Sequence, residues 1–325
     1  MSNENILEVR NLKKHFPIKA GVFQHVVGHV KSVDGVSFEI KKGQTFGLVG
    51  ESGSGKSTTG RAIIGLEKVT SGEITFEGHD VTSRKDRKEI DYDQDVQMIF
   101  QDSFSSLNPR KRIESIIAEP LKNFENLTPE QEKIKVLQLM KIVGLSPDAL
   151  YKYPHQFSGG QRQRIGIARA VATNPKLVIA DEPVSALDLS VQAQVLNFMK
   201  KIQRNMGVSY LFISHDLGVV RHMCDRIAIM NRGQIVEIGS REDIYKHPKH
   251  LYTQRLLAAI PSTKVADRDK DRERRQKIEK EYKEKQKDYY DKEGRAYPLV
   301  EVSKGHLVAL PPKEALKYKD IKEEN

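Results

Sequence analysis

Short apolar runs separated by turn residues open the chain. Residues 6–9, 36–40 and 45–49 are rich in Val, Ile, Leu and Phe, a composition typical of β-strands. Lys41, Lys42 and Gly43, between the second and third runs, are typical of a turn. We therefore predict three brief strands in the first part of the chain.

Helical patterns follow. A glycine-rich loop beginning at Gly50 leads into residues 57–66, which have the length of a helix and end near Gly65. Residues 101–157 are predicted to be mainly helical, because apolar positions recur there at helical spacing, for example within 129–143. We interpret this segment as a helical insertion.

Strands and helices alternate after residue 158. The pattern predicts a helix to residue 172, a strand at 177–180, a helix at 191–205 and a strand at 210–214. Such alternation indicates an α/β fold with a parallel sheet. The strand at 177–180 is apolar at every position, so we expect helices on both faces of the sheet and the chemistry in the loops.

Composition narrows the class of protein. Hydrophobic residues are 38% and charged residues 30% of the 325 positions, as in soluble globular proteins. No apolar run approaches the ~18 residues that span a bilayer, and no secretory signal pattern is present, so we predict a cytoplasmic protein. The single cysteine, Cys224, excludes an intramolecular disulfide and is expected in the core. The net charge of +10 would suit nucleic acid, an anionic membrane surface or ATP, and does not choose among them.

Residues 50–57 read Gly-Glu-Ser-Gly-Ser-Gly-Lys-Ser, which fits the phosphate-loop pattern G-x4-G-K-[ST] between a predicted strand and a predicted helix. In this pattern backbone N–H groups and the helix N-terminus surround phosphate oxygens. Lys56 is expected to reach the β- and γ-phosphates, and Ser57 to offer its hydroxyl to Mg²⁺. The predicted nucleotide-binding residues here are Gly50, Glu51, Ser52, Gly53, Ser54, Gly55, Lys56, Ser57 and Thr58.

Two adjacent carboxylates, Asp181 and Glu182, directly follow the apolar strand at 177–180. The carboxyl edge of a parallel sheet is where ligands bind, so Asp181 is predicted to hold the metal. Glu182 is predicted to polarise the water that attacks the γ-phosphate. By itself such a pair is more often a solvated turn. We interpret it as functional only because the same chain carries a phosphate loop.

Residues 157–161, Phe-Ser-Gly-Gly-Gln, precede an apolar-periodic helix with Ser158 as the predicted N-cap. The segment resembles the ABC signature Leu-Ser-Gly-Gly-Gln. The resemblance implies a P-loop NTPase (ABC ATPase) core with a parallel sheet, an antiparallel β subdomain and an inserted helical subdomain. It also implies that two such domains sandwich two ATP molecules, each phosphate loop facing the partner's signature. The further nucleotide contacts that it implies are Ser158, Gly159, Gly160, Gln161 and Asp188, the last from a stretch similar to the D-loop.

Three more residues stand at positions where the ABC family has residues of known role. Gln101 resembles the Q-loop glutamine, which implies both a catalytic role and a place near the metal. His215, after the strand at 210–214, resembles the switch histidine, although a lone histidine at a strand end is usually structural. Phe16 occupies the place of the ring that packs on adenine, and an aromatic residue there could equally belong to the core. The catalytic set is therefore Lys56, Gln101, Glu182 and His215, with Ser57, Gln101 and Asp181 toward Mg²⁺.

Residues 106–110, 247–261 and 299–309 resemble the ATPases of oligopeptide and dipeptide permeases, the last stretch most of all the F-type subunit. This implies an ATPase domain at 1–262, with a helical subdomain at about 102–157, and a charged linker with a C-terminal extension at 263–325. It also implies a peripheral position on the cytoplasmic face of the membrane. The implied partners are a second, D-type ATPase, two transmembrane permease subunits and an extracytoplasmic peptide-binding protein.

Residues 264–292 depart from that pattern, with 12 basic and 9 acidic side chains and little to bury. They are predicted to form a solvated helix or a disordered linker. The mixed signs argue against a nucleic-acid-binding arm. We assign the segment no function and expect its deletion to spare ATP hydrolysis.

Two alternatives to an oligopeptide importer stay open. Related ATPases power importers of dipeptides, nickel or other small solutes, and cargo is chosen by other subunits. A soluble ABC ATPase acting on the ribosome or on DNA is compatible with the +10 charge, but such proteins generally have two cassettes or long coiled coils.

Overall fold

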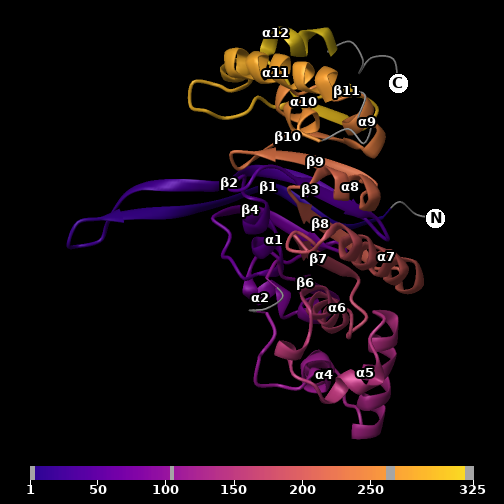
Figure 1. Ribbon diagram of the computed structural model, residues 1–325. Coiled ribbons are helices and arrows are strands. Elements are labelled where there is room, and N and C mark those ends of the chain that lie inside the picture. The colour runs from indigo at the N-terminus through magenta and orange to yellow at the C-terminus, as the bar shows by residue number, and fades with distance from the viewer. Residues whose placement is uncertain (1–3, 103–105, 261–267, 319–325) are drawn as a thin grey trace.

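Two β-sheets form the centre of the molecule in the computed structural model, which describes residues 4–102, 106–260 and 268–318 (Figure 1). The larger sheet has eight strands in the order β11-β12-β10-β9-β3-β8-β7-β6, and the smaller has four in the order β2-β1-β4-β5. In those orders the larger sheet comprises Leu299–Ser303, His306–Ala309, Gln234–Ser240, Arg226–Asn231, Thr45–Val49, Ser209–Ser214, Leu177–Asp181 and Val96–Ile99. The smaller sheet comprises His25–Lys41, Asn5–Ala20, Ser71–Phe76 and His79–Asp80.

The middle of the larger sheet is parallel. Strands β6, β7, β8, β3 and β9 pair in parallel, and the three strands beyond β9 pair antiparallel. The smaller sheet is antiparallel throughout. The predicted α/β class, with a parallel core sheet and an antiparallel β subdomain, is confirmed. Because parallel strands end at a common edge, the loops after β3, β7 and β8 meet there.

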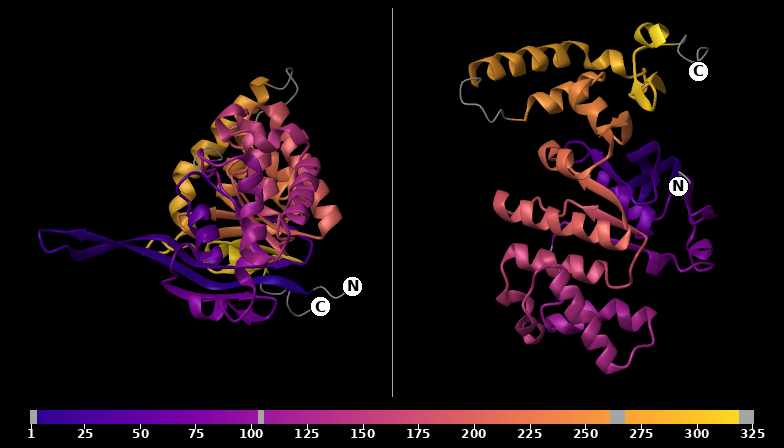
Figure 2. Two further views of the ribbon diagram at one scale, coloured as in Figure 1. Left: turned by 90° about the horizontal axis from the view of Figure 1, so that it is seen from below. Right: turned by 90° about the vertical axis from the view of Figure 1, so that its right-hand side faces the viewer.

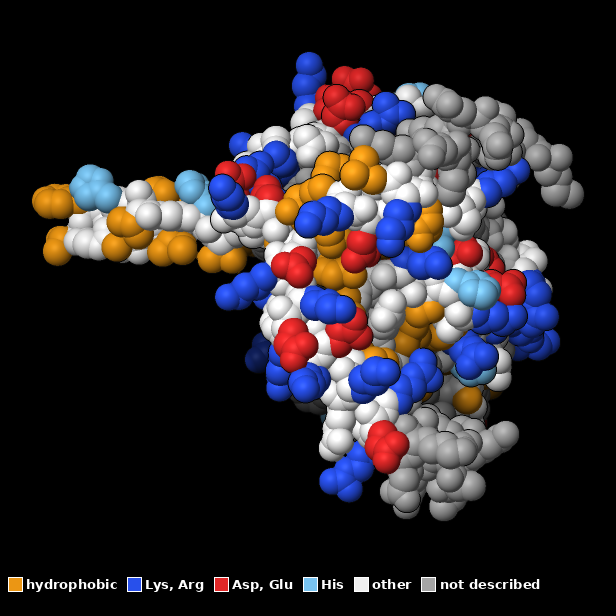
Figure 3. Space-filling model, turned by 90° about the horizontal axis from the view of Figure 1, so that it is seen from above, with side chains coloured by type: hydrophobic (Ala, Val, Ile, Leu, Met, Phe, Trp, Pro, Cys, Tyr) orange, Lys and Arg blue, Asp and Glu red, His pale blue; other side chains and the backbone are white. Residues whose placement is uncertain are grey.

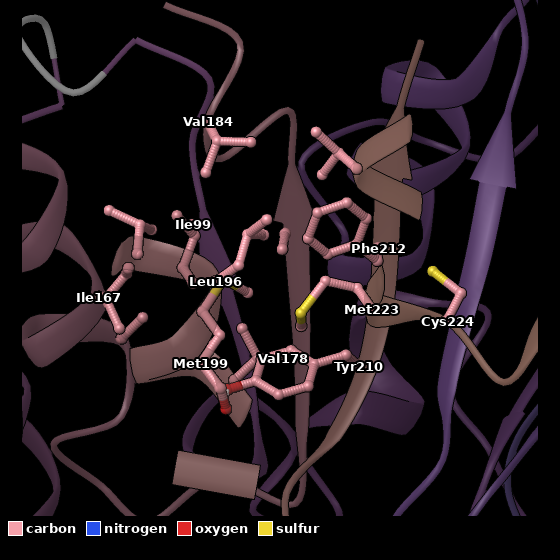
Figure 4. Packing of buried hydrophobic residues seen from close by; sticks show 14 of the residues in the cluster. Ile99, Ile167, Val178, Val184, Leu196, Met199, Tyr210, Phe212, Met223 and Cys224 are labelled. Carbon is pink, nitrogen blue, oxygen red and sulfur yellow. Dashed lines mark hydrogen bonds between the residues drawn. The ribbon is translucent and has the colours of Figure 1, made fainter. Parts of the chain in front are cut away.

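Both faces of the parallel strands are buried, as the apolar run at 177–180 predicted. Along β8, Tyr210 and Phe212 pack into one core, and Leu211 and Ile213 into the other, because successive side chains point to opposite faces. The first core lies under α6, α7 and α8 and contains Cys224, as expected (Figure 4). On the second face the smaller sheet packs beside α1.

The helices before β9 either pack on the core sheet or belong to the insertion (Figure 2). Helices α4 and α5 with the short turns η1 and η2 lie between β6 and α6, at the end of the molecule opposite the C-terminal elements. The inserted helical subdomain is thus confirmed, while its limits of 102–157 remain a prediction. These elements are α1 (Lys56–Ile64), α2 (Arg84–Arg87), α3 (Tyr92–Asp95), α4 (Ile113–Phe124), α5 (Pro129–Ile142), η1 (Pro147–Tyr151), η2 (Pro154–Gln156), α6 (Gly159–Ala170), α7 (Leu189–Met206) and α8 (Leu217–Met223).

The first two strands are much longer than predicted. Strands β1 and β2 pair from the core out to Ala20 and His25, whereas pairing of β1 with β4 stops at Lys13. The outer half of the β1–β2 pair is therefore a two-stranded ribbon that projects from the rest of the molecule (Figure 3). The prediction of brief strands failed there because the ribbon has no buried face that would impose a regular alternation of apolar and polar residues. Its exposed apolar residues are Ile18, Val22, Phe23, Val26, Val27 and Val30.

The C-terminal elements pack on the core instead of trailing from it. They comprise α9 (Arg241–Lys246), α10 (Leu251–Ala258), α11 (Arg268–Lys285), η4 (Gln286–Tyr289), β11, β12 and α12 (Pro312–Ala315). Strand β12 pairs with β10 and so extends the core sheet. Since this pairing joins residues on the two sides of the predicted boundary, the domain limits of 1–262 and 263–325 remain a prediction.

The charged segment at 264–292 is helical over α11, while residues 261–267 lie outside the described residues. The expectation that it has almost nothing to bury is wrong, because Tyr282, Tyr289 and Tyr290 are buried against the core. The Asn231 side-chain amide donates to the Tyr290 hydroxyl at 2.8 Å. Among the described helices, none has the length and apolar character of a membrane span.

Candidate active site

The phosphate loop connects β3 to α1, and backbone atoms of other segments lie close against two of its glycines. A Cβ on Gly50 would lie 2.1 Å from the Met230 carbonyl oxygen, and one on Gly55 would lie 2.1 Å from the Ser32 carbonyl oxygen. Gly55 also has φ of +103°, a conformation that favours glycine. The loop therefore needs glycine at both positions to wrap as it does.

Lys56 lies at the first turn of α1 with its side chain buried. Its ammonium donates to the carbonyl oxygens of Gly50 at 2.9 Å and Glu51 at 2.8 Å. Burial lowers the pKa of Lys56, although the charges of Glu182 and Asp181 oppose that shift. The loop thus holds a cation at its centre, where a phosphate group would lie.

Ser57 and Asp181 are in direct contact, although 124 positions separate them. The Ser57 hydroxyl donates to Asp181 Oδ1 at 2.8 Å, and burial raises the pKa of the Asp181 carboxyl group. A hydroxyl and a carboxylate are the hard oxygen donors that Mg²⁺ prefers, usually completed by waters and phosphate oxygens. The pair therefore fits a magnesium ion held between protein and nucleotide.

Glu182 is held by two side chains from other elements. Gln101 Nε2 donates to Glu182 Oε2 at 2.9 Å, and His215 Nδ1 lies 2.9 Å from Glu182 Oε1. The backbone of Glu182 has φ of +46°, which costs about 1–3 kcal/mol for a residue other than glycine. Its N–H donates to the Ile213 carbonyl at 2.9 Å, so the neighbouring strand helps to hold the strained conformation.

A cavity of about 750 Å³ brings these groups together. Its lining includes most of the predicted phosphate loop and also Gln101, Glu182 and His215. It also includes residues that no motif in the sequence indicates, namely Ser32, Asp216, Leu217, Leu256, Ala259 and Ile260. Residues 256–260 belong to the stretch 247–261 that resembles the permease ATPases.

The signature residues do not line this cavity. Ser158 caps α6, with its hydroxyl accepting from the Gln161 N–H at 3.3 Å and Gln161 Oε1 accepting from the Ser158 N–H at 3.0 Å. Gly159 borders a separate hollow of about 360 Å³, which also touches Gln101 and Glu182. Within one chain Gly159 and the phosphate loop therefore line different hollows, and Gln101 and Glu182 border both.

Asp188 and Phe16 also lie outside the cavity lining. The Asp188 carboxylate caps α7 by accepting from the Val191 N–H at 2.9 Å. The Lys14 ammonium lies 4.5 Å from the centroid of the Phe16 ring and so occupies one of its faces. Their predicted contacts with nucleotide remain predictions.

Two protein-family models match the chain. The model described as ABC transporter covers residues 33–185. The model described as Oligopeptide/dipeptide transporter, C-terminal region, covers residues 236–292.

Curated relatives match nearly the whole chain. The oligopeptide transport ATP-binding protein OppF of Lactococcus lactis subsp. lactis (strain IL1403) is 58% identical over 306 residues, which are 94% of this chain and 96% of that protein. OppF of Bacillus subtilis (strain 168) is 47% identical over 94% of this chain and 96% of its own length. The glutathione import ATP-binding protein GsiA of Pectobacterium atrosepticum is 45% identical over 95% of this chain but only 49% of its own length.

Solved structures share the fold. An ATP-binding cassette solved as a dimer in a post-hydrolysis state, bound to ADP and Pi, superimposes with a TM-score of 0.64 at 27% identity, covering 72% of this chain and 98% of that one. A nucleotide-free cassette from an ABC transporter gives a TM-score of 0.60 at 26% identity, with coverages of 73% and 91%. The chain therefore belongs to the ABC transporter family of ATP-binding proteins, in the group that carries the oligopeptide/dipeptide transporter C-terminal region.

Proposed function

We propose that this chain is the ATP-binding and ATP-hydrolysing subunit that powers an ABC importer for oligopeptides. The observation that carries the proposal is the convergence of Gln101 and His215 on Glu182 at the cavity that holds Lys56. This arrangement places a carboxylate beside a phosphate-binding loop, where it can orient and polarise the water that attacks a nucleoside triphosphate. The identity to oligopeptide transport proteins supports the cargo class.

Each residue of the site has a distinct role in this proposal. The loop N–H groups and Lys56 bind the β- and γ-phosphates, and Ser57, Asp181 and Gln101 hold Mg²⁺, which when bound neutralises phosphate charge. Glu182 orients and polarises the attacking water. Gln101 and His215 fix the carboxylate through the two 2.9 Å contacts.

The working unit in this proposal contains a second, D-type ATPase. Ser158, Gly159, Gly160 and Gln161 would contact nucleotide bound to that partner, with Asp188 beside them. The position of the signature outside its own chain's cavity supports this arrangement. The dimeric solved cassette is a second support.

The remaining partners are two transmembrane permease subunits and, indirectly, an extracytoplasmic peptide-binding protein, so the chain would lie peripherally on the cytoplasmic face of the membrane. Closure of the ATP sandwich would shift the permeases between conformations. We propose no nucleic-acid partner, because the charged helix α11 mixes both signs. The ATPase domain would span 1–262 and the extension 263–325.

A different small peptide as cargo is the second candidate, favoured by the 45% identity to a glutathione import protein. A mild-detergent pull-down of the tagged chain from its native cells, with mass spectrometry of its partners, tests the proposal. Two permeases, a second ATPase and a peptide-binding protein are expected. Recovery of ribosomal or DNA-bound proteins in their place would refute transport and leave the ATPase chemistry standing.

A further inference from the structure

Glu51, the second residue of the phosphate loop, is held by helix α10, which lies some 200 residues later in the sequence. The Tyr252 hydroxyl accepts from the Glu51 N–H at 3.1 Å and donates to Glu51 Oε2 at 3.3 Å. Arg255 Nη1 lies 3.1 Å from Glu51 Oε1. Both the backbone and the carboxylate of Glu51 are therefore fixed from the C-terminal region.

Arg255 connects the loop to the charged helix α11. Its Nε lies 2.8 Å from Glu279 Oε2, and its guanidinium lies 4.7 Å from the centroid of the Tyr282 ring. Burial acts against the charge, yet the hydrogen bond to Glu279 and the charge of Glu51 raise the pKa of Arg255. One arginine thus joins a carboxylate of the phosphate loop to a carboxylate of α11.

The connection continues into the nucleotide-binding groups. The Glu51 carbonyl accepts from the Lys56 ammonium at 2.8 Å, so the residue that Tyr252 and Arg255 hold is also one that positions Lys56. Leu256 of α10 and Ala259, the residue that follows this helix, line the same cavity. A continuous series of contacts therefore runs from Glu279 through Arg255 and Glu51 to Lys56.

We propose that Tyr252 and Arg255 are positioning residues of the phosphate loop, and that α11, through Glu279, sets how firmly they hold it. The C-terminal region then tunes the affinity of this chain for ATP. The inference rests on the proposed function, in which the loop binds ATP. It adds to the expectation that deletion of residues 264–292 spares ATP hydrolysis, because such a deletion would also weaken the binding of ATP.

The effect should be modest, because the Glu51 and Glu279 side chains are 50% and 40% exposed and partly exposed ion pairs contribute little each. We expect Arg255→Gln to weaken nucleotide binding about three- to tenfold, and Glu279→Gln about two- to threefold. Tyr252→Phe, which removes both hydroxyl contacts and keeps the ring, should weaken it in the same direction. Arg255→Lys should recover part of the affinity, because it keeps a positive charge near Glu51.

Equilibrium binding of a fluorescent ATP analogue to the purified full-length chain measures these effects, with unfolding midpoints recorded in parallel. Glu281→Gln is the matched control for Glu279→Gln, since Glu281 pairs with Lys285 on the same helix. Arg226→Gln is the control for Arg255→Gln, since Arg226 anchors the C-terminal region through the Gly305 carbonyl at 2.9 Å. Neither control should change the affinity.

Two results would overturn the inference. If Arg255→Gln and Tyr252→Phe both bind the ATP analogue as tightly as the wild type, the contacts with Glu51 do not position the loop. An equal loss in Arg226→Gln would show that only the general docking of the C-terminal region matters. Failure of the wild-type chain to bind the analogue would instead refute the proposed function, so the two failures are distinguishable.

Discussion

The substitution Glu182→Gln isolates the proposed base, because it removes the negative charge and keeps the shape of the side chain. The glutamine amide oxygen can still accept from Gln101 Nε2, and its NH2 group can donate to His215 Nδ1 in the other imidazole tautomer. Both 2.9 Å contacts are therefore retained. Only the ability to polarise and accept a proton from the attacking water is lost.

The expected loss of turnover follows from that role. A positioned general base contributes about 10²- to 10⁴-fold in rate, which corresponds to roughly 2.7–5.4 kcal/mol on the barrier. The affinity for ATP should stay the same or rise slightly, because a negative charge near the phosphates disappears and Lys56 keeps its bonds to the Gly50 and Glu51 carbonyls.

Phosphate release at saturating ATP and binding of a fluorescent ATP analogue, both measured on the purified transporter complex, separate the two effects. Glu242→Gln is the control, because Glu242 pairs with Lys246 on the exposed surface of α9. Turnover within about twofold of wild type would refute the role of Glu182 as base. Loss of binding together with turnover would show that its contribution is structural.

Three other changes test separate parts of the fold. Burial lowers the pKa of His250 from 6.5 to about 3, so the unfolded chain takes up a proton below pH 6.5 that the folded chain does not. The free energy of unfolding should therefore fall as the pH drops below 6.5, by at most about 1.4 kcal/mol per pH unit from this group. In urea unfolding at several pH values, His250→Asn should make this dependence on pH shallower. An unchanged dependence would contradict the role of His250. Gly50→Ala should weaken binding of the ATP analogue roughly tenfold, because its Cβ would lie 2.1 Å from the Met230 carbonyl oxygen, and normal affinity would show that the loop can shift freely. Replacing Val22 and Phe23, which are 95% and 82% exposed, by serine should change the free energy of unfolding by less than about 0.5 kcal/mol, whereas a larger loss in thermal or urea unfolding would show that the ribbon tip is packed.

The local pattern of apolar and polar residues was sufficient to predict the elements whose side chains are buried on the parallel sheet. The strand at 177–180 and the helix after Gly55 are where the apolar runs and the glycine-rich loop predicted them. The same reasoning failed for the ribbon of β1 and β2, whose exposed outer half has no buried face to impose alternation. It also failed for the charged segment, where Tyr282 and Tyr290 are buried among many charges.

The order of residue types along the chain is enough to show which chemistry is present. Lys56 and Ser57 could be named from spacing, because a phosphate-binding loop requires specific residue types at fixed offsets. Asp181 and Glu182 could be named because they follow an apolar strand in a chain that also carries that loop. Contacts between distant segments have no such local signature. The three-dimensional packing alone decided that Gln101 and His215 meet on Glu182, and that α10 reaches Glu51, because these contacts depend on how the elements pack around the sheet and leave no periodicity in the chain.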